Sequence, residues 1–400
     1  MSLLHKLSDP KAWNSFLKYK SSLVCQKSFL QELSAFISEE KYLDAAAAFT
    51  PGADFPLPRK SVISKLSSQK KRTVYVYPPD ENMMLKFLTY LTVRKYDALF
   101  SENLYSFRPG RTAKDAVRKL LRIRNLSDMY CYKADIHDYF NSVPVPLLLP
   151  KLQEALSDDP ALYQFLSGLL LEPSVLDRGQ KAAERKGIMA GTPQSSFLAN
   201  LYLSDLDRHF DEEDVLYCRY SDDIILFSET SEDVQKHEAY IRSFLQEKGL
   251  LINPDKEYFS APGQPFTFLG FQISGKTVDI APATVKKLKA KMRRKRDALS
   301  RWQKRSASDP ERAASAFIRV FNRKLLESPE GHELSWANWF FSVINTTESL
   351  HEIDRYAQDC IRYLLSGSHT KKRFRVSYED LKALGYRSLV HEYYNVSVKS

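Results

Sequence analysis

The sequence of 400 residues predicts an α+β fold that ends in an all-helical region. Residues 216–227 are typical of two short apolar strands joined by a tight turn. Residues 130–273 mix such strands with helical segments, which favours antiparallel hairpins with helices on one face over a doubly wound sheet. After about residue 281 the apolar residues recur at helical spacing.

The first 70 residues are predicted to form a helical extension, because two segments carry apolar residues at helical spacing before a Pro-rich break. A strand of β-branched and aromatic residues follows, ends at Pro78 and Pro79, and leads into another helix. In chain order we expect helices over 11–23 and 29–48, the break over 51–60, the strand over 73–77 and the helix over 81–99.

The middle of the chain carries the strands that decide the fold class. Its central hairpin turns at Ser221-Asp222-Asp223, residue types that favour turns. The expected elements are a strand over 130–136, mostly helix over 145–171, a helix over 198–210, the hairpin over 216–227, a helix over 231–248 and a strand over 266–273.

The composition indicates a globular protein, with 43% hydrophobic and 27% charged residues, and the length favours roughly two to four compact units. No run of about 18 apolar residues occurs, so we expect no transmembrane helix and no membrane partner. The N-terminus does not resemble a signal peptide, and the 4 cysteines lie too far apart for a disulfide framework or zinc motif. These features favour a cytoplasmic location.

Three aspartates stand where predicted strands end. Asp135 follows the first strand of the middle region, and Asp222 and Asp223 occupy the hairpin turn. Taken alone, Ser221-Asp222-Asp223 is also explained as a plain turn. Carboxylates that converge from two segments repel one another unless cations lie between them. Two Mg²⁺ ions about 3.5–4 Å apart would relieve that repulsion and support phosphoryl transfer, with Mn²⁺ as an alternative ion.

Five segments resemble motifs of the bacterial, group II intron-like reverse transcriptases, in that family's order. Ser106 stands in place of a glycine of the fingers motif, and Ser221 stands in place of an alanine of motif C. The segments are residues 103–111 (fingers), 134–140 (motif A), 220–223 (motif C), 249–256 (motif D) and 268–270 (motif E, the primer grip).

This resemblance implies a right-hand polymerase with fingers and palm, followed by an all-helical thumb and C-terminal region. The implied boundaries are 1–70 for the helical N-terminal extension, 71–125 for the fingers, 126–275 for the palm with finger insertions, and 276–400 for the helical thumb and C-terminal RNA-binding region.

The resemblance also implies roles for individual residues. Phe140 takes the place of an aromatic gate that excludes a 2′-hydroxyl, although a core Phe would fit the pattern too. Lys71, Arg72 and Lys256 would contact the nucleotide, or be plain surface and turn cations. The resemblance implies that the catalytic residues are Asp135, Asp222 and Asp223, and that these residues together with Ile136 bind the metal ions. The implied dNTP-binding residues are Lys71, Arg72, Phe140, Ala190, Gly191 and Lys256. The implied primer-grip residues are Phe268, Leu269 and Gly270.

Motif B admits two registers. A gap-free register begins at Gly187 and puts Ala190 where the family has a glutamine under the nucleotide. The other matches residues 191–194 to the family's Gly-Thr-Pro-Gln, but it requires a four-residue deletion. We prefer the gap-free register, with Gln194 as a substitute for the missing glutamine.

The net charge of +10 is concentrated between Lys286 and Arg305, where eleven cations accompany one acid. An apolar stripe at Val285, Leu288, Met292, Leu299 and Trp302 predicts one long helix with charged outer faces. Such a helix either is simply solvated or neutralises the phosphates of a template–primer duplex. The residues predicted to bind nucleic acid are Arg108, Lys286, Lys287, Lys291, Arg294, Lys371, Lys372 and Arg373.

Residues 381–389 resemble the C-terminus of defence-associated, unknown-group reverse transcriptases. The resemblance implies an RNA-directed DNA polymerase that copies a dedicated noncoding RNA in antiphage defence, with dNTPs and an RNA–DNA hybrid as partners. Template-independent DNA synthesis on the same site and a non-catalytic, maturase-like RNA-binding protein are the alternatives. The oligomeric state is not readable from the sequence.

Overall fold

The computed structural model describes residues 1–23, 25–50, 52–64, 71–184, 186–327 and 335–397, without the side chains of Ser64, Lys71 and Ser397. The chain divides into two compact units, the first formed largely by residues 1–264 and the second by residues 265–400. Each unit is described by itself.

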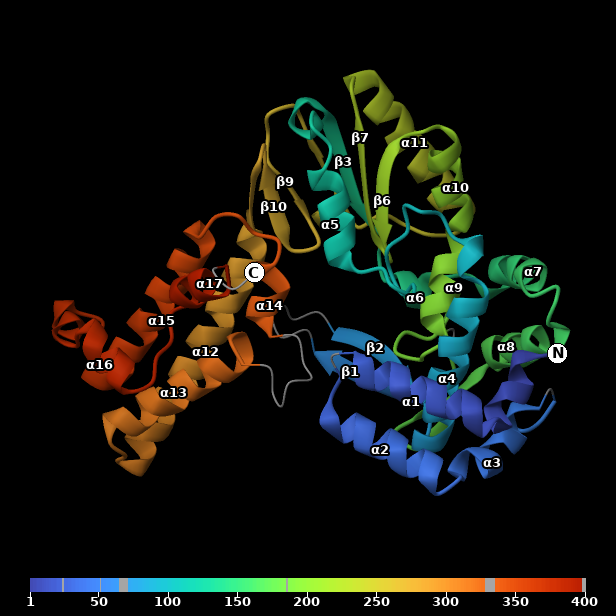
Figure 1. The fold of residues 1–400 in the computed structure, drawn as a ribbon, viewed down its shortest axis with the longest axis horizontal. Helices are drawn as coiled ribbons and strands as arrows, with labels where there is room; N and C mark the ends of the chain where they lie inside the picture. The colour runs from blue at the N-terminus through green and yellow to red at the C-terminus, as the bar shows by residue number, and fades with distance from the viewer. Residues whose placement is uncertain (24, 51, 65–70, 185, 328–334, 398–400) are drawn as a thin grey trace. The chain divides into compact units, whose positions relative to one another are not determined.

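The first unit begins with short helices that lie against one longer helix, α4 (Figure 1). Trp13 joins them: its buried ring lies 4.1 Å from that of Phe87 on α4 and 5.4 Å from that of Phe36 on α2. These elements are η1 (Leu3–Ser8), α1 (Pro10–Ser22), α2 (Lys27–Ser38), α3 (Lys41–Ala46), η2 (Ala47–Phe49) and α4 (Pro79–Lys95).

A four-stranded sheet follows, in the order β2-β1-β4-β5. Strand β1 lies in the predicted helical extension and Pro-rich break, so this part of the prediction is wrong. The strand forms because it pairs along its whole length with β2, from Arg59 opposite Val76 to Ser64 opposite Lys71. The strands are β1 (Arg59–Ser64), β2 (Lys71–Val76), β4 (Ser174–Asp177) and β5 (Gln180–Ala183).

The central sheet of this unit has the order β6-β7-β3-β8 and is antiparallel throughout. Helix α11 packs on β3 and β7, so its buried residues Val234, Ile241 and Leu245 cover the sheet (Figure 1). The strands are β3 (Tyr130–Asp135), β6 (Leu216–Tyr220), β7 (Asp223–Ser228) and β8 (Tyr258–Ser260).

The helices around these sheets complete the first unit. The predicted helix over 198–210 is two helices that meet at Leu203, and the predicted helical stretch over 145–171 is likewise two helices. They are η3 (Asp97–Leu99), α5 (Ala113–Leu121), η4 (Leu126–Asp128), α6 (Tyr139–Ser142), α7 (Val145–Ala155), α8 (Pro160–Leu171), α9 (Ser195–Tyr202), α10 (Ser204–Glu212), α11 (Ser231–Glu247) and η5 (Pro254–Lys256).

The second unit combines a small antiparallel sheet, β11-β10-β9, with helices. Helix α15 packs against both α12 and α13, and its buried face includes Ile353, Ala357 and Ile361 (Figure 1). Its elements are β9 (Phe266–Phe268), β10 (Phe271–Ser274), β11 (Thr277–Ile280), α12 (Pro282–Ser306), α13 (Pro310–Leu325), α14 (Trp336–Phe341), α15 (Glu348–Ser366), η7 (Lys371–Arg375), α16 (Tyr378–Ala383) and α17 (Leu389–Ser397).

The α+β class with a helical C-terminal region is confirmed. The compact first unit ends at Gln264, whereas the sequence places the end of the palm at 275, because the predicted strand over 266–273 is a β9–β10 hairpin grouped with the second unit. Within the described residues, no helix is both long and apolar enough to cross a membrane.

Candidate active site

Two neighbouring strands bring the three aspartates together. Asp135 ends β3 and lies opposite Asp223, the first residue of β7, in the antiparallel register. Directly opposed residues have Cβ atoms about 5 Å apart. Asp222 occupies the turn before Asp223, and its carbonyl accepts a hydrogen bond from the Ile136 N–H at 3.1 Å. The carboxylates predicted from two separate segments therefore lie at one end of one sheet.

The surroundings of the three aspartates disfavour a negative charge on Asp222 and place a positive charge next to Asp135 and Asp223. Burial raises the pKa of Asp222, and the adjacent Asp135 and Asp223 raise that pKa further. Lys256 Nζ lies 2.6 Å from Asp135 Oδ2, and Lys133 Nζ lies 3.2 Å from Asp223 Oδ1. Two lysines thus offset part of the negative charge that the three carboxylates bring together.

Asp135 is also fixed from a third segment. Its backbone carbonyl accepts a hydrogen bond from the Asn253 N–H at 2.7 Å, and Asn253 Nδ2 donates to its Oδ1 at 3.2 Å. Asn253 directly precedes η5, which carries Lys256. The segment resembling motif D therefore anchors the segment resembling motif A.

The donor set suits Mg²⁺, since hard oxygen ligands are what that ion prefers. Among the described residues, however, no three His, Cys, Asp or Glu side chains already stand in the arrangement of a metal site. The lysine contacts give a physical reason, because Asp135 and Asp223 each direct an oxygen to an ammonium group.

Three of the segments predicted to bind the nucleotide, those of Arg72, Phe140 and Ala190, lie close to one another, whereas Lys256 lies against Asp135. The guanidinium of Arg72 lies 6.0 Å from the centre of the Phe140 ring, and the Phe107 ring lies edge-on to that ring at 6.3 Å. Ala190 is fully buried; its N–H donates to Asn141 Oδ1 at 3.2 Å, and its carbonyl accepts from the Tyr75 N–H at 2.8 Å. Lys71 begins β2, but its side chain lies outside the described part.

Two glycines explain how the motif B loop fits here. At Gly187, which has φ +53°, a Cβ would lie 2.5 Å from the Phe140 carbonyl oxygen. At Gly191, with φ +99°, it would lie 3.2 Å from the Tyr75 carbonyl oxygen. Both positions need glycine for backbone conformation and for close approach. Gly191 belongs to both registers, so the choice between them stays a prediction.

Gln194, the alternative nucleotide contact, is only 5% exposed, and no hydrogen-bond partner for its amide is found among the described residues. It directly precedes α9.

Arg108 must be removed from the predicted nucleic-acid contacts. It is 8% exposed, and its Nε lies 2.8 Å from Asp97 Oδ1. Its NH1 also donates to the carbonyls of Ser101 and Leu104. The arginine therefore closes the loop after η3 rather than facing a ligand.

In the second unit, α12 presents most of the predicted basic residues to solvent. Val285, Met292 and Leu299 are buried as the stripe predicts, while Trp302 is 39% exposed. Lys286, Lys287, Lys291 and Arg294 are exposed. The last three line a hollow of about 780 Å³ between α12 and α13, whose apolar lining includes Met292, Phe317, Phe321 and Trp336.

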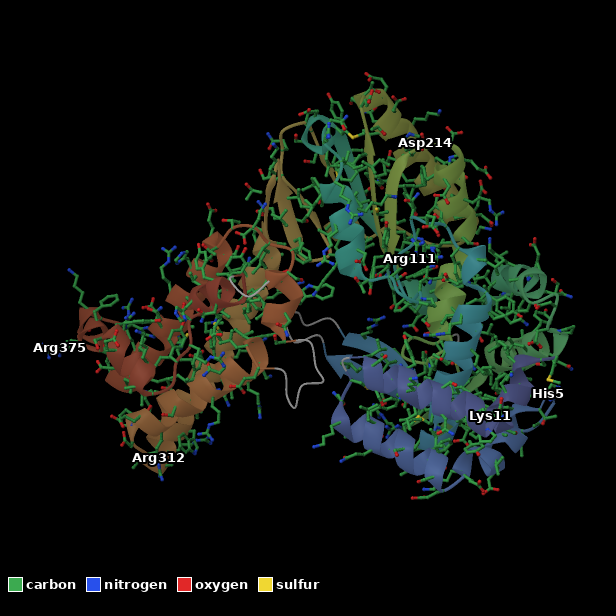
Figure 2. All side chains as sticks on the ribbon, in the orientation of Figure 1. His5, Lys11, Arg111, Asp214, Arg312 and Arg375 are labelled. Carbon is green, nitrogen blue, oxygen red and sulfur yellow. The ribbon has the colours of Figure 1, made fainter. Side chains whose placement is uncertain are left out.

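The predicted basic cluster in the tail forms η7. Lys371 and Lys372 are exposed, and Arg373 lies 4.5 Å above the ring of Phe374, which is itself 57% exposed. Figure 2 labels the neighbouring Arg375 and, on α13, Arg312. The stretch 381–389, by contrast, contributes core side chains such as Leu381, Tyr386 and Leu389.

The residues predicted to form a primer grip lie where β9 turns into β10: Phe268 ends β9, and Leu269 and Gly270 form the turn. Phe268 is fully buried, and Leu269 and Gly270 have φ values of +50° and +90°. All three belong to the second unit.

Sequence reasoning missed Lys133 and Asn253. Side chains alternate between the two faces of a strand, and Lys133 lies two residues before Asp135 in β3. The sequence therefore already places Lys133 on the same face of the strand as Asp135. The Asn253 contact depends on a segment more than a hundred residues away, and no local pattern indicates it.

Curated relatives match parts of the chain. It is 32% identical over 106 residues to the retron Ec86 reverse transcriptase of Escherichia coli, covering 26% of this chain and 33% of that protein. It is 30% identical over 165 residues to an uncharacterized 91 kDa protein in the cob intron of Schizosaccharomyces pombe, covering 40% of this chain and 18% of that protein. The matches thus span a third or less of each relative.

The solved structures that match the chain include two of Candida tropicalis telomerase. Apo telomerase truncated from its C-terminal domain matches with a TM-score of 0.45 and 16% identity, over 56% of this chain and 55% of that one. Telomerase in complex with a fragment of telomeric RNA matches with a TM-score of 0.47 and 13% identity, over 88% of this chain and 68% of that one.

The family model "Reverse transcriptase (RNA-dependent DNA polymerase)" matches residues 63–273, which is more than half of the chain and contains all three aspartates. The chain therefore belongs to the reverse transcriptase family.

Proposed function

We propose that the protein is an RNA-directed DNA polymerase that copies a dedicated noncoding RNA by two-metal nucleotidyl transfer. One observation carries the proposal: the β3–β7 register puts Asp135 opposite Asp223, with Asp222 in the adjoining turn. The family match and the similarity to a retron reverse transcriptase support it.

Asp135, Asp222 and Asp223, with the backbone of Ile136, are the proposed holders of two Mg²⁺ ions, and Mn²⁺ is an alternative. Bound there, the ions would activate the primer 3′-hydroxyl and stabilise the leaving pyrophosphate. Lys256 and Lys133 would leave the carboxylates when the ions bind, since one carboxylate oxygen cannot serve both equally. Lys256 would then be free to protonate or escort the pyrophosphate.

The nucleotide would be held between the fingers strand β2 and the motif B loop. Arg72 supplies positive charge for the triphosphate, with Lys71 before it in the chain. Phe140 supplies the ring that would collide with a ribose 2′-hydroxyl, so dNTPs are the proposed substrates. Gly191 is exposed and would present its backbone to the nucleotide, whereas Ala190 is buried, has no polar side chain and would act by fixing this loop against Tyr75 and Asn141.

Within this proposal the fingers begin near Arg59 with β1, the palm contains the β6-β7-β3-β8 sheet, and the second unit forms the primer grip and thumb. The exposed cations of α12 would neutralise phosphates of an RNA–DNA hybrid without reading its sequence. The η7 cluster, with its exposed Phe374, would contact unpaired RNA by stacking and charge.

A role in antiphage defence is the finer part of the proposal. It rests on the resemblance of residues 381–389 to defence-associated reverse transcriptases. Plating phage on cells that carry the wild-type chain or Asp222→Ala tests it: protection that needs Asp222 supports defence, and equal plaque counts contradict it.

The activity is tested on protein purified with the RNA that it retains from cells. Mg²⁺ and labelled dNTPs are added singly and together, with Asp222→Ala as the control. DNA complementary to the retained RNA, absent in the variant, is the expected result. DNA unrelated to that RNA would indicate template-independent synthesis. RNA retention without incorporation would indicate a maturase-like binding protein.

A further inference from the structure

A buried polar network lies beneath the turn that carries Asp222. None of its members is more than 5% exposed, and they come from the fingers motif, α9, α10 and the β6–β7 hairpin. The members are Ser106, Asn200, Asp207, Arg219 and Ser221.

The network holds both backbone polar groups of Ser221. This residue directly precedes Asp222 and has φ +61°, a left-handed conformation that non-glycine residues rarely adopt. Its N–H donates to Ser106 Oγ at 2.9 Å, and its carbonyl accepts from Arg219 NH1 at 3.2 Å. A two-residue hairpin loop between the paired Tyr220 and Asp223 requires this conformation, which is costly for a serine, and two side chains hold its backbone groups in place.

The orientation of the Ser106 hydroxyl is fixed by Asn200. The hydroxyl donates to Asn200 Oδ1 at 3.0 Å, and Asn200 Nδ2 donates to the Ser106 carbonyl at 2.7 Å. With its proton given to Asn200, the oxygen of Ser106 is an acceptor aimed at the Ser221 N–H. A glycine, which the resembling family has at position 106, cannot make this contact.

Arg219, which donates to the Ser221 carbonyl, is itself held by an ion pair with Asp207. Its Nε and NH2 lie 2.7 and 2.5 Å from the two carboxylate oxygens of Asp207, and its NH2 also donates to the Asn200 carbonyl at 3.2 Å. Burial alone would lower the pKa of Arg219, but Asp207 raises that pKa above its ordinary value. The guanidinium is thus a permanently charged and rigid support.

We propose that Ser106 is a positioning residue: its hydroxyl holds the Ser221 N–H and thereby fixes the turn that presents Asp222 and Asp223. The inference deepens the proposed polymerase function and rests on it for its kinetic consequence. Removing the hydroxyl leaves the Ser221 N–H and Asn200 Oδ1 without partners in a dry interior, which favours local opening of the turn. A turn that opens presents its carboxylates in the reacting geometry for less of the time.

Hydrogen exchange of the turn tests the contact directly, because it does not depend on any enzymatic activity. In Ser106→Ala, amide exchange in a peptide that spans residues 217–227 should rise about tenfold, which corresponds to about 1.4 kcal/mol. A peptide from α11 should not change. The matched control is Ser167→Ala, another buried serine, whose hydroxyl bonds the Gln164 carbonyl within α8.

Steady-state kinetics test the consequence. Ser106→Ala should lower kcat about tenfold and change the KM for dNTP less than about twofold, since Ser106 does not face the nucleotide. Ser106→Gly should behave like Ser106→Ala. If Ser106→Gly instead retains wild-type kcat and exchange, the hydroxyl is dispensable and the proposal is wrong. Unchanged exchange in Ser106→Ala also overturns the proposal. The predicted rise in exchange together with an inactive wild-type enzyme would count against the proposed function alone.

Discussion

At the scale of single residues, Phe140 gives a sharp test of substrate choice. Its ring is partly buried, 5.6 Å from Tyr139 and 6.3 Å from Phe107. If the ring blocks a 2′-hydroxyl, Phe140→Ala removes the clash. The preference for dNTP over rNTP should then fall about 10- to 100-fold, as expected for a steric contact of about 1–3 kcal/mol.

The measurement is the ratio of kcat/KM for dGTP and GTP on the retained RNA template. Phe140→Tyr keeps a ring at the same place and should keep the preference. If Phe140→Ala lowers both kcat/KM values equally, the residue is a core phenylalanine, the alternative that the sequence leaves open.

His237 gives a residue-scale prediction about stability. It is 9% exposed on α11, with its ring 5.6 Å from Phe210. Burial lowers its pKa and Lys236 lowers it further, against Asp233 and Glu213. A histidine whose folded-state pKa is depressed contributes stability above its unfolded pKa, near 6.5, and that contribution is lost as the pH falls below it.

Urea unfolding at pH 5.5 and 7.5 checks this sign. The wild-type midpoint should be lower at pH 5.5, and His237→Leu should reduce the difference between the two pH values. His351→Gln, a change at an exposed histidine, should leave that difference as it is. A larger difference in His237→Leu would contradict the predicted sign.

At the scale of elements, α12 carries two kinds of lysine: some are exposed and available to bind phosphates, and one is already paired with a carboxylate. Lys287 and Lys291 are exposed on the hollow beside α13. Lys289 lies 2.8 Å from Glu352 and 5.1 Å from the Tyr356 ring on α15. Each phosphate contact adds about 0.7–0.9 to the slope of log affinity against log salt concentration.

The double variant Lys287→Gln and Lys291→Gln should therefore lower that slope by about 1.4–1.8 for an RNA–DNA hybrid, measured by fluorescence anisotropy at several salt concentrations. Lys289→Gln is the matched control and should change the slope little. Equal slopes in all three proteins would show that α12 is a solvated helix that does not contact the duplex.

At the scale of the whole molecule, the sequence predicted what local pattern can encode. The hairpin around Asp222, the buried stripe of α12 and the α+β class all follow from periodicity and turn residues. Strand β1 was missed because its stability comes from pairing with β2, and the surrounding prolines masked it. The sequence suggests that Asp135 and Asp223 lie close together, but it does not give the register that puts them opposite each other. Asn253, which bonds Asp135, and Ser106, which bonds the turn at Ser221, lie on distant segments whose proximity no local pattern encodes.

The tail shows how one residue can hold a large part of the second unit together. Asp354 on α15 is 3% exposed and accepts hydrogen bonds from Tyr386 Oη at 2.7 Å and Ser388 Oγ at 2.6 Å. The N–H groups of Leu389 and Val390 at the start of α17 also donate to it, at 2.9 and 3.1 Å. This carboxylate therefore fixes the 381–389 stretch and α17 onto α15.

Asp354→Ala should destabilise the second unit by about 3 kcal/mol, because it leaves several buried donors without an acceptor. Hydrogen exchange should rise in peptides from residues 348–397 and stay unchanged in peptides from residues 130–260. Asp359→Ala is the control on the same helix, since Asp359 is half-exposed and its carboxylate lies 3.4 Å from Arg373 Nε. If both variants exchange alike, α17 is held by its apolar contacts, such as that of Leu389, and the carboxylate is dispensable.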